Sequence, residues 1–258
     1  MEAEHILETW RLLDLEYDDP FANMAVEEAI PRVVGNENAP CTLRFWRNPN
    51  TIVVGCYQSV NLEVDLNVCA KYKTQIVRRF TGGGTVYHDH GNLNYSISVP
   101  KTHRLVPTGD PIGILKRFSN IVASCLESLG LHSEIRSFSN IEVNQKKIYG
   151  AAGSMRWGTV FCHGSILVNS NLDILYQVLK FDDYPDTHFV KSVRKPVTTI
   201  SRELNTMLSP KKVSRILLRF LEKKCGIQFV NDRLTKKERI LADELYDKYS
   251  SHQWNFKI

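Results

Sequence analysis

The chain has 258 residues, of which 43% are hydrophobic and 24% charged, a balance typical of one large globular domain. Its formal net charge is +5. This small, scattered basic excess argues against a nucleic-acid-binding protein and suits an anionic ligand or an acidic protein partner. No apolar run is long enough to cross a membrane, and the N-terminus has no signal-peptide core, so we expect a cytoplasmic protein.

Six cysteines are spread widely along the chain, with neither a CxxC pair nor a metal-ligand spacing among them. We therefore expect buried free thiols in a reducing compartment. They are Cys41, Cys56, Cys69, Cys125, Cys162 and Cys225.

The first third of the chain alternates strand and helix patterns. Residues 10–15 are typical of a strand, and residues 21–30 carry their apolar side chains on one helical face. Two β-rich runs, residues 42–47 and 51–56, flank the turn-forming Asn48-Pro49-Asn50, which predicts a β-hairpin.

A helix is predicted for residues 61–73, with Leu62, Leu66, Cys69 and Ala70 on its inward face. Strand patterns follow at residues 75–80, 84–89 and 92–100. Because they come in close succession, we expect an antiparallel meander.

The stretch between the first two of these strands places Arg78 and Arg79 just before the triplet Gly82-Gly83-Gly84. Consecutive glycines weaken both helices and strands, but they let a ligand lie against bare N–H groups. With two guanidinium groups at its entry, such a turn suits a phosphate or a carboxylate. The alternative is an ordinary glycine-rich hairpin with two solvated arginines.

The middle of the chain begins with the clearest helix pattern, residues 111–129, followed by short strands within residues 133–143 and a turn at residues 144–146. Lys147 then opens a run of small residues, which lets the backbone pass close to a ligand while one ammonium points inward. The alternative for a single lysine is a solvated surface position.

The last third is predicted to be mainly helical. A helix spans residues 171–179, a loop follows at residues 181–188, and a helix at residues 211–224 has a basic outer face. A final helix covers residues 236–249.

Several of these stretches together resemble lipoate-protein ligase A. The long pattern Arg78-Arg79-x-Thr81-Gly82-Gly83-Gly84-x-Val86-Tyr87-His88-Asp89-x-Gly91-Asn92-Leu93-Asn94 is similar to the signature of that family. Lys147-Ile148-x-Gly150-x-Ala152 and His163-Gly164-x-x-Leu167 resemble its second signature, and Trp46-Arg47 resembles a pair that lines its acyl-chain pocket. The segment at residues 191–200 resembles a family loop that packs near the site.

The resemblance implies an α+β fold, a mixed and largely antiparallel β-sheet flanked by helices, of the biotin and lipoate ligase catalytic-domain type. Residues 249–256 resemble the element that closes the catalytic domain of larger ligases. We therefore expect residues 1–258 to form one catalytic domain, with the accessory domain absent and supplied as a separate accessory ligase subunit.

The implied reaction activates lipoate, or octanoate, with ATP and Mg²⁺ to an acyl-adenylate, then transfers the acyl group to a lysine of a lipoyl-carrier protein of the E2 or glycine-cleavage H protein type. Lys147 would be the catalytic residue, its ammonium offsetting charge in both transition states. The residues implied to contact the nucleotide or the acyl group are Trp46, Arg47, Arg79, Gly82, Gly83, Gly84, Thr85, Val86, Tyr87, His88, Asp89, Asn92, Gly150, Ala151 and His163.

One departure from the family pattern leaves the metal ligands open. Family members often carry an Asn-Asp pair before the lysine motif, where this chain has Ser139-Asn140. If the register is right, a carboxylate is lost, and Mg²⁺ would rely on the phosphates or on Asp89.

Three other functions compete with this reading. An acyltransferase of the same superfamily would use a cysteine thioester, but the cysteine-using relatives place that nucleophile upstream of the lysine motif, where this chain has none. Cys162 adjoins His163, but strand neighbours face opposite sides, so we expect no dyad. A transferase using a pre-activated acyl donor stays an alternative, whereas the intact Arg79, glycine triplet and Lys147 argue against a non-catalytic carrier-binding module.

Overall fold

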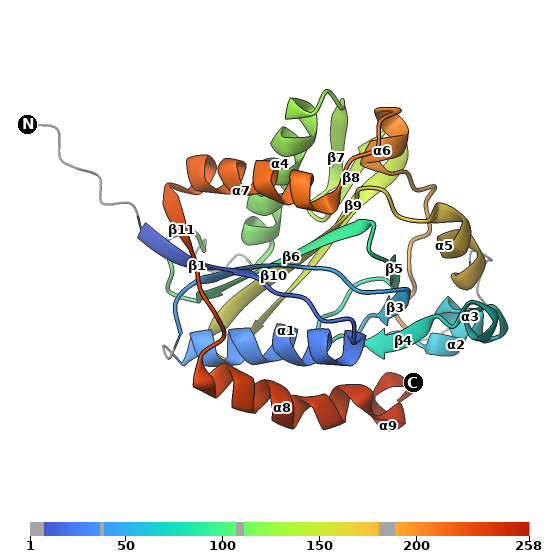
Figure 1. Cartoon of the computed structure of the whole chain (residues 1–258), viewed down its shortest axis with the longest axis horizontal. Coiled ribbons are helices and arrows are strands. Elements are labelled where there is room, and N and C mark those ends of the chain that lie inside the picture. The colour runs from blue at the N-terminus through green and yellow to red at the C-terminus, as the bar shows by residue number, and fades with distance from the viewer. Residues whose placement is uncertain (1–7, 37–38, 107–110, 181–188, 258) are drawn as a thin grey trace, which may run out of the picture.

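The computed structural model describes residues 8–36, 39–106, 111–180 and 189–257 (Figure 1). Within these residues the chain forms an eight-stranded sheet and a three-stranded sheet. The larger sheet crosses the middle of the molecule, with helices on both of its faces, and the smaller one lies at one end of it (Figure 1).

The large sheet is mixed and largely antiparallel. Its first three strands run parallel to one another, and every other neighbouring pair is antiparallel. The fold class expected from the sequence is therefore confirmed. In spatial order the strands are β11 (Ile227–Asn231), β1 (Glu8–Asp14), β2 (Thr42–Trp46), β6 (Asn92–Pro100), β10 (Thr159–Leu167), β9 (Lys146–Arg156), β8 (Asn140–Val143) and β7 (Ser133–Ser137).

Strand β6 shows why helices cover both faces of this sheet. Its apolar residues, Leu93, Tyr95, Ile97 and Val99, join the core that includes α4 (Pro111–Ser128) and α7 (Pro210–Cys225). Its alternate residues are polar yet also buried, and Ser96 donates a hydrogen bond to Glu27 of α1 (Pro20–Gly35) on the other face. Side chains of a strand alternate between faces, so one face of β6 supports an apolar core and the other a polar interior.

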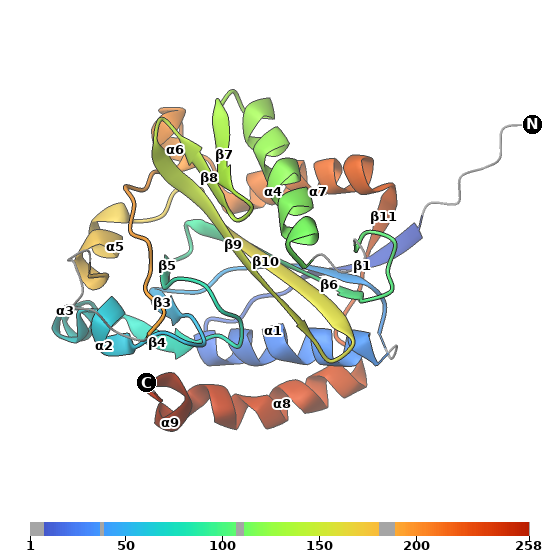
Figure 2. The ribbon, with the colours of Figure 1, turned by 180° about the vertical axis from the view of Figure 1, so that it is seen from behind.

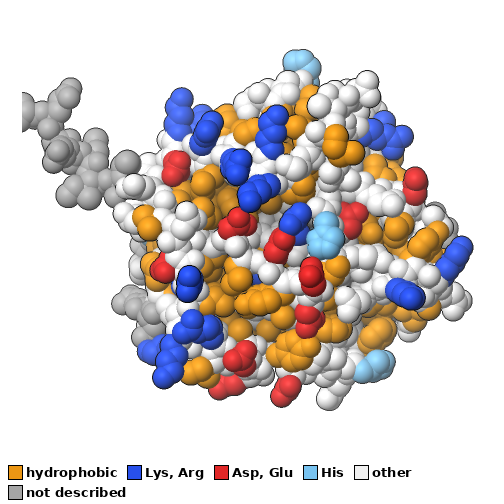
Figure 3. Space-filling view, viewed as in Figure 1, with side chains coloured by type: hydrophobic (Ala, Val, Ile, Leu, Met, Phe, Trp, Pro, Cys, Tyr) orange, Lys and Arg blue, Asp and Glu red, His pale blue; other side chains and the backbone are white. Residues whose placement is uncertain are grey.

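The outer helices complete the layers. Helix α8 (Lys236–Ser250) packs along the outer side of α1, away from the sheet (Figure 1). Helix α7 buries Val213, Leu217 and Leu221 and exposes its basic residues, so the predicted basic outer face is confirmed. Figure 3 shows these blue side chains gathered over α7. The exposed basic residues are Lys211, Lys212, Arg215, Arg219, Lys223 and Lys224.

The small sheet has the order β4 (Gln75–Arg78), β3 (Thr51–Val54), β5 (Val86–His88), and β3 pairs parallel with β4 but antiparallel with β5. Its core is shared with three short helices: α2 (Val60–Glu63), α3 (Leu66–Tyr72) and α5 (Leu172–Val178). The predicted meander of residues 75–100 is wrong, because β5 does not pair with β6 and β4 does not pair with β5.

The predicted hairpin of residues 42–56 is also wrong, since β2 belongs to the large sheet and β3 to the small one. Asn48, in the turn between them, is fully buried. Asn23 of α1 donates hydrogen bonds to the Asn48 side chain at 2.9 Å and to the Arg47 carbonyl at 3.2 Å. These contacts hold the turn against α1, so the chain passes from one sheet to the other there.

The helix expected at residues 61–73 is divided into α2 and α3. Val64 forms a β-bridge with Leu179, and the Asp65 side chain accepts a hydrogen bond from the Val68 amide at the start of α3. The change of direction leaves Leu66 and Ala70 exposed, contrary to prediction, while Cys69 is buried as predicted.

The C-terminal part of the described chain adds α6 (Ile200–Glu203) and α9 (His252–Asn255), and also strand β11, which the sequence analysis missed. Arg78 anchors α9 from within the core, because its buried guanidinium donates to the carbonyls of Trp254 and Asn255 and, on its other side, Gly55 and Gln58. No helix in the described ranges is both long and apolar enough to span a lipid bilayer.

Candidate active site

A cavity of about 340 Å³ opens between the small sheet and the β9–β10 hairpin. Residues 190–197, which we call the covering segment, line one side of it with every residue except Pro196. Figure 2 shows this segment as an orange trace that runs beside β9 toward the small sheet. The cavity thus brings together three stretches that are far apart in the sequence.

Most residues singled out from the sequence line this cavity. The lining includes Trp46, Arg79, Gly83, Gly84, Thr85, Val86, Tyr87, His88, Asn92, Lys147, Gly150, Ala151 and His163. Gly82, Asp89 and Arg47 are not among the lining residues.

Each of these three residues has another place in the structure. The Gly82 carbonyl accepts hydrogen bonds from Arg79. Asp89 accepts from the amides of Gly91 and Asn171, so its carboxylate joins two loops. Arg47 pairs with Glu16 in a second, smaller hollow.

Arg79 organises the glycine turn, which we call the glycine loop (residues 81–85). Its buried guanidinium donates to the carbonyls of Gly82 and Gly84, at 2.7 and 2.8 Å, and to that of Val53 at 3.2 Å. Burial lowers its pKa to about 10, so it remains a cation at neutral pH. Gly83 adopts a φ of +88°, which side chains rarely tolerate, so the loop needs glycine there.

Lys147 is a partly buried cation on the cavity wall. Its backbone amide donates a hydrogen bond to the Pro196 carbonyl at 2.8 Å, and its carbonyl accepts one from the Thr198 amide at 3.0 Å, so the backbone of Lys147 is fixed. Burial, and then the neighbouring charges of Arg194 and Arg79, lower the pKa of its ammonium to about 8. A lysine that pays this penalty is poised to receive an anion.

Gly150 leaves the space in which the Lys147 side chain lies. A Cβ at Gly150 would sit 3.1 Å from both Cε and Nζ of Lys147. The requirement for a small residue in this part of the sequence is therefore steric, because it lets the ammonium lie close to the strand backbone.

The covering segment adds a cation that the sequence analysis did not single out. Arg194 lines the cavity and donates to the Thr85 carbonyl of the glycine loop at 3.1 Å. Among the neighbouring charges, that of Arg194 lowers the pKa of Lys147 the most. The only signal in the sequence was the resemblance of residues 191–200 to a family loop.

The inner end of the cavity is polar, and we call it the inner chamber (Glu27, Trp46, His88 and Asn94). One side-chain atom of each residue is buried without a hydrogen-bond partner: Glu27 Oε2, Trp46 Nε1, His88 Nε2 and Asn94 Oδ1. Buried polar groups without partners are costly. Such a cluster in a cavity wall therefore indicates a ligand or water that completes them.

The two histidines of the cavity are neutral. Burial lowers the pKa of His88 to about 3, and burial with the Arg79 charge lowers that of His163 well below its ordinary value. His163 shares a hydrogen bond of 2.8 Å with the Thr81 hydroxyl. Both rings are therefore suited to orient groups by hydrogen bonds and not to supply positive charge.

Comparison with known proteins identifies the family. Residues 19–222 match the lipoyl protein ligase A/B catalytic domain. The chain belongs to this family. It is 34% identical to "Lipoate-protein ligase A subunit 1" of Thermoplasma acidophilum over 254 residues, which cover 92% of each chain.

Solved structures of lipoate-protein ligases share its fold. A structure of a putative lipoate protein ligase from T. acidophilum with bound lipoic acid superposes with a TM-score of 0.82 at 31% identity, over 97% of this chain and 100% of that one. A lipoate-protein ligase A bound with ATP gives a TM-score of 0.81 at 34% identity, over 96% and 98%. The chain is also 30% identical to the octanoyltransferase LipM of Moorella thermoacetica, covering 96% of this chain and 97% of that one.

No cysteine is among the residues that line the cavity of this ligase-family chain. Cys162 packs into the core with α4, whereas its neighbour His163 faces the cavity, so the two form no dyad, as predicted. Burial raises the pKa of the Cys162 thiol and that of Cys125, to about 12 for the latter, and both are poor nucleophiles.

The cavity does not offer a carboxylate pair for Mg²⁺. Among its described lining residues Glu27 is the only acid, and it pairs with Arg44 at 2.9 Å. Asn140 contributes only an amide, and Asp89 lies outside the lining. In the described residues, the one cluster with metal-ligand geometry is Glu8, Cys41 and His103, which is not part of the cavity. The residues present do not fit a protein-held magnesium ion.

Proposed function

We propose that the protein is the catalytic subunit of an ATP-dependent lipoate-protein ligase. The lipoate carboxylate attacks the α-phosphorus of ATP, the bond to pyrophosphate breaks, and lipoyl-adenylate forms. The ε-amine of a carrier lysine then attacks the acyl carbonyl carbon. AMP leaves with the bonding electron pair, and the amine loses a proton as the amide forms.

The observation that carries this proposal is the set of cations in the cavity. Lys147, Arg79 and Arg194 all line it, and the charges of the two arginines lower the pKa of Lys147. In both steps negative charge builds on phosphate or carbonyl oxygens, and preorganised cations stabilise it without reorganising. Bare amides of the glycine loop would supply further donors.

The inner chamber suits the far end of the acyl group. An octanoyl chain would place a methyl group against unpartnered polar atoms such as Trp46 Nε1 and His88 Nε2. A dithiolane ring instead presents polarizable sulfur atoms, which are weak hydrogen-bond acceptors. We infer that lipoate is favoured over octanoate.

The partners follow from the relatives. The T. acidophilum protein at TM-score 0.83 and 34% identity is described as a bipartite lipoate protein ligase with its E2 lipoyl domain. We infer that this chain likewise modifies a lipoyl-carrier domain, of the E2 or H protein type, and works with a separate accessory subunit in the cytoplasm.

Lipoate-dependent exchange of labelled pyrophosphate into ATP tests the proposal, with and without the second subunit of such a ligase. We expect exchange that requires lipoate and rises with that subunit. The similarity to octanoyltransferases defines the competing outcome: transfer from an octanoyl-carrier protein without ATP, and no exchange in any mixture, would replace the ligase by a transferase.

A further inference from the structure

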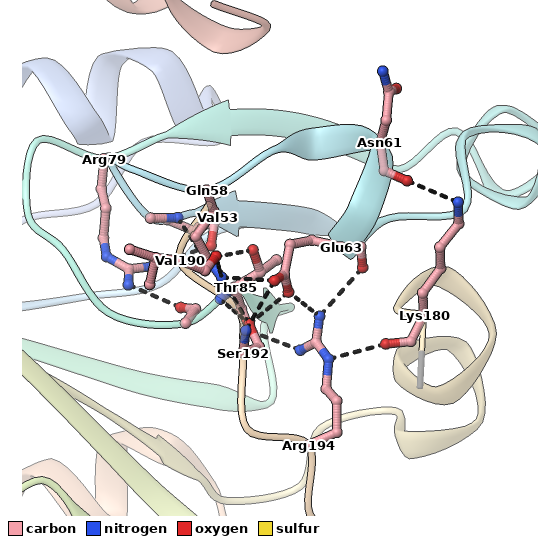
Figure 4. A network of polar contacts seen from close by, with 12 residues as sticks. Val53, Gln58, Asn61, Glu63, Arg79, Thr85, Lys180, Val190, Ser192 and Arg194 are labelled. Atoms are coloured by element: carbon pink, nitrogen blue, oxygen red, sulfur yellow. Dashed lines mark hydrogen bonds and ion pairs between the residues drawn. The ribbon is translucent and has the colours of Figure 1, made fainter. Parts of the chain in front are cut away.

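Glu63 of α2 carries a carboxylate that is buried in the protein, 1% exposed, and reaches toward Ser192 and Arg194 of the covering segment (Figure 4). It accepts hydrogen bonds from the Ser192 amide at 2.9 Å, from the Ser192 hydroxyl and from Arg194, both at 2.5 Å. Gln58 donates a fourth, at 2.8 Å. The acceptor positions of an ionised carboxylate are thus filled, three of them by the covering segment.

Gln58 ties this carboxylate to the glycine loop. Its Oε1 accepts from the Gly55 amide at 3.1 Å and from the Thr85 hydroxyl at 2.8 Å. Both of those groups are donors there, so the amide nitrogen must face the opposite way, toward Glu63. The side chain is therefore fixed in one orientation between the two elements (Figure 4).

Ser192 makes the second link. Its hydroxyl donates to Glu63 and accepts from the Thr85 amide at 2.8 Å and from Gln58 at 2.9 Å, so its donor and both acceptor sites are used. The third link is Arg194, whose guanidinium bridges the Glu63 carboxylate and the Thr85 carbonyl. Gln58, Ser192 and Arg194 are thus the three links between the covering segment and the glycine loop, and each of them is hydrogen-bonded to Glu63.

We propose that Glu63 is a positioning residue: it holds Ser192 and Arg194 across the glycine loop, so that Arg194 stands ready beside Lys147 for the α-phosphate. Buried ion pairs add little net stability, so a buried carboxylate here is better explained by the geometry it imposes than by stability alone. Because the anion that Arg194 would meet is the adenylate phosphate, this inference rests on the proposed function.

The test uses Glu63→Gln, with Glu238→Gln as the matched control. Glutamine keeps the shape of the glutamate side chain, but its amide nitrogen replaces one acceptor oxygen by a donor. This nitrogen then faces donor groups of Ser192 or Arg194. Glu238 is equally buried and also pairs with an arginine, Arg11, away from the cavity. Both variants lose a buried charge pair, but only the first disturbs the covering segment.

For Glu63→Gln we expect the KM for ATP in pyrophosphate exchange to rise about tenfold or more, since a charge-assisted bond that orients Arg194 is lost. The KM for lipoate stays within about twofold, because the inner chamber is untouched. Hydrogen exchange at the Thr85 and Ser192 amides accelerates. Glu238→Gln lowers thermal stability and leaves these three quantities at the wild-type values.

The positioning role is overturned if the wild type shows exchange activity and Glu63→Gln nevertheless matches Glu238→Gln in its KM for ATP and in its amide exchange. Wild type without lipoate-dependent exchange refutes the proposed function instead, and the network is then judged by amide exchange alone. If Glu63→Gln fails to fold, Ser192→Ala decides: unchanged ATP KM and unchanged Thr85 protection overturn the inference.

Discussion

Replacing Lys147 by methionine should abolish most of the activity and at the same time stabilise the fold. The substitution keeps the length of the side chain and removes its charge. In the folded protein the pKa of Lys147 is about 8, against an ordinary value of 10.5, because burial and neighbouring cations penalise the charged form. Below pH 8 the lysine is protonated in both the folded and the unfolded states, so the full penalty is present.

The size of the effect follows from this pKa difference, which corresponds to about 3 kcal/mol. Because the ammonium is only partly buried and water screens it, we expect a gain of about 2 kcal/mol in the free energy of unfolding for Lys147→Met at pH 7. For a chain of this size that is a rise in Tm of roughly 4–8 °C. The gain should shrink between pH 8 and about 10.5, as the wild-type lysine loses its proton in the folded state first.

The activity should change in the opposite direction. Loss of one preorganised cation at a developing negative charge costs about 10²–10³-fold in rate. Pyrophosphate exchange and thermal unfolding measure the two effects on the same samples. Lys146→Met is the control, since Lys146 is exposed on the same strand and should change neither. A Lys147→Met enzyme with near wild-type exchange, or with a lower Tm, would refute the reasoning.

Three further results are expected. The kcat/KM of exchange should fall above pH 8 as Lys147 deprotonates, and a profile that stays flat to about pH 9.5 would show that its charge is not used. Gly150→Ala should reduce exchange about tenfold with little loss of stability, because its Cβ displaces the Lys147 ammonium. Gly164→Ala is the control: its Cβ would lie 2.5 Å from the Tyr149 ring, so it should mainly destabilise the fold. The reverse pattern would count against the placement of the Lys147 ammonium beside Gly150. Asn94→Leu should raise the octanoate-to-lipoate ratio of kcat/KM at least about threefold, because it removes one unpartnered polar atom of the inner chamber and puts an apolar side chain there, and an unchanged ratio would remove its role in selectivity.

The sequence predicted the longer helices, but not the division of residues 61–73 into α2 and α3, and it predicted the two stretches that meet in the cavity, because these carry strong local signals. Gly83, Gly84 and Gly150 are each closely approached, because an added Cβ would lie about 3 Å from Arg79, Ser192 or Lys147, whereas Gly82 has room for one. Residue spacing alone could not say that the two stretches converge. The family resemblance supplied that expectation.

The pairing of strands could not be predicted in the same way. Residues 42–56 have the local pattern of a hairpin, but the contact of Asn48 with Asn23 on α1 redirects the chain between two sheets. Such a contact joins residues 25 positions apart and leaves no periodic signal. Glu63 was missed for the same reason, since a single acid in a helical pattern is typical of a solvated surface.

The claim on which the account depends is that the acyl carboxylate is activated on the α-phosphate of ATP within this cavity. Lipoate labelled with ¹⁸O in its carboxyl group, incubated with ATP, the protein, its partner subunit and a lipoyl-carrier domain, tests this directly by mass spectrometry. The account predicts AMP that carries one labelled oxygen and a lipoylated carrier that carries the other. Lipoylated carrier accompanied by unlabelled AMP, or formed without ATP, would contradict it.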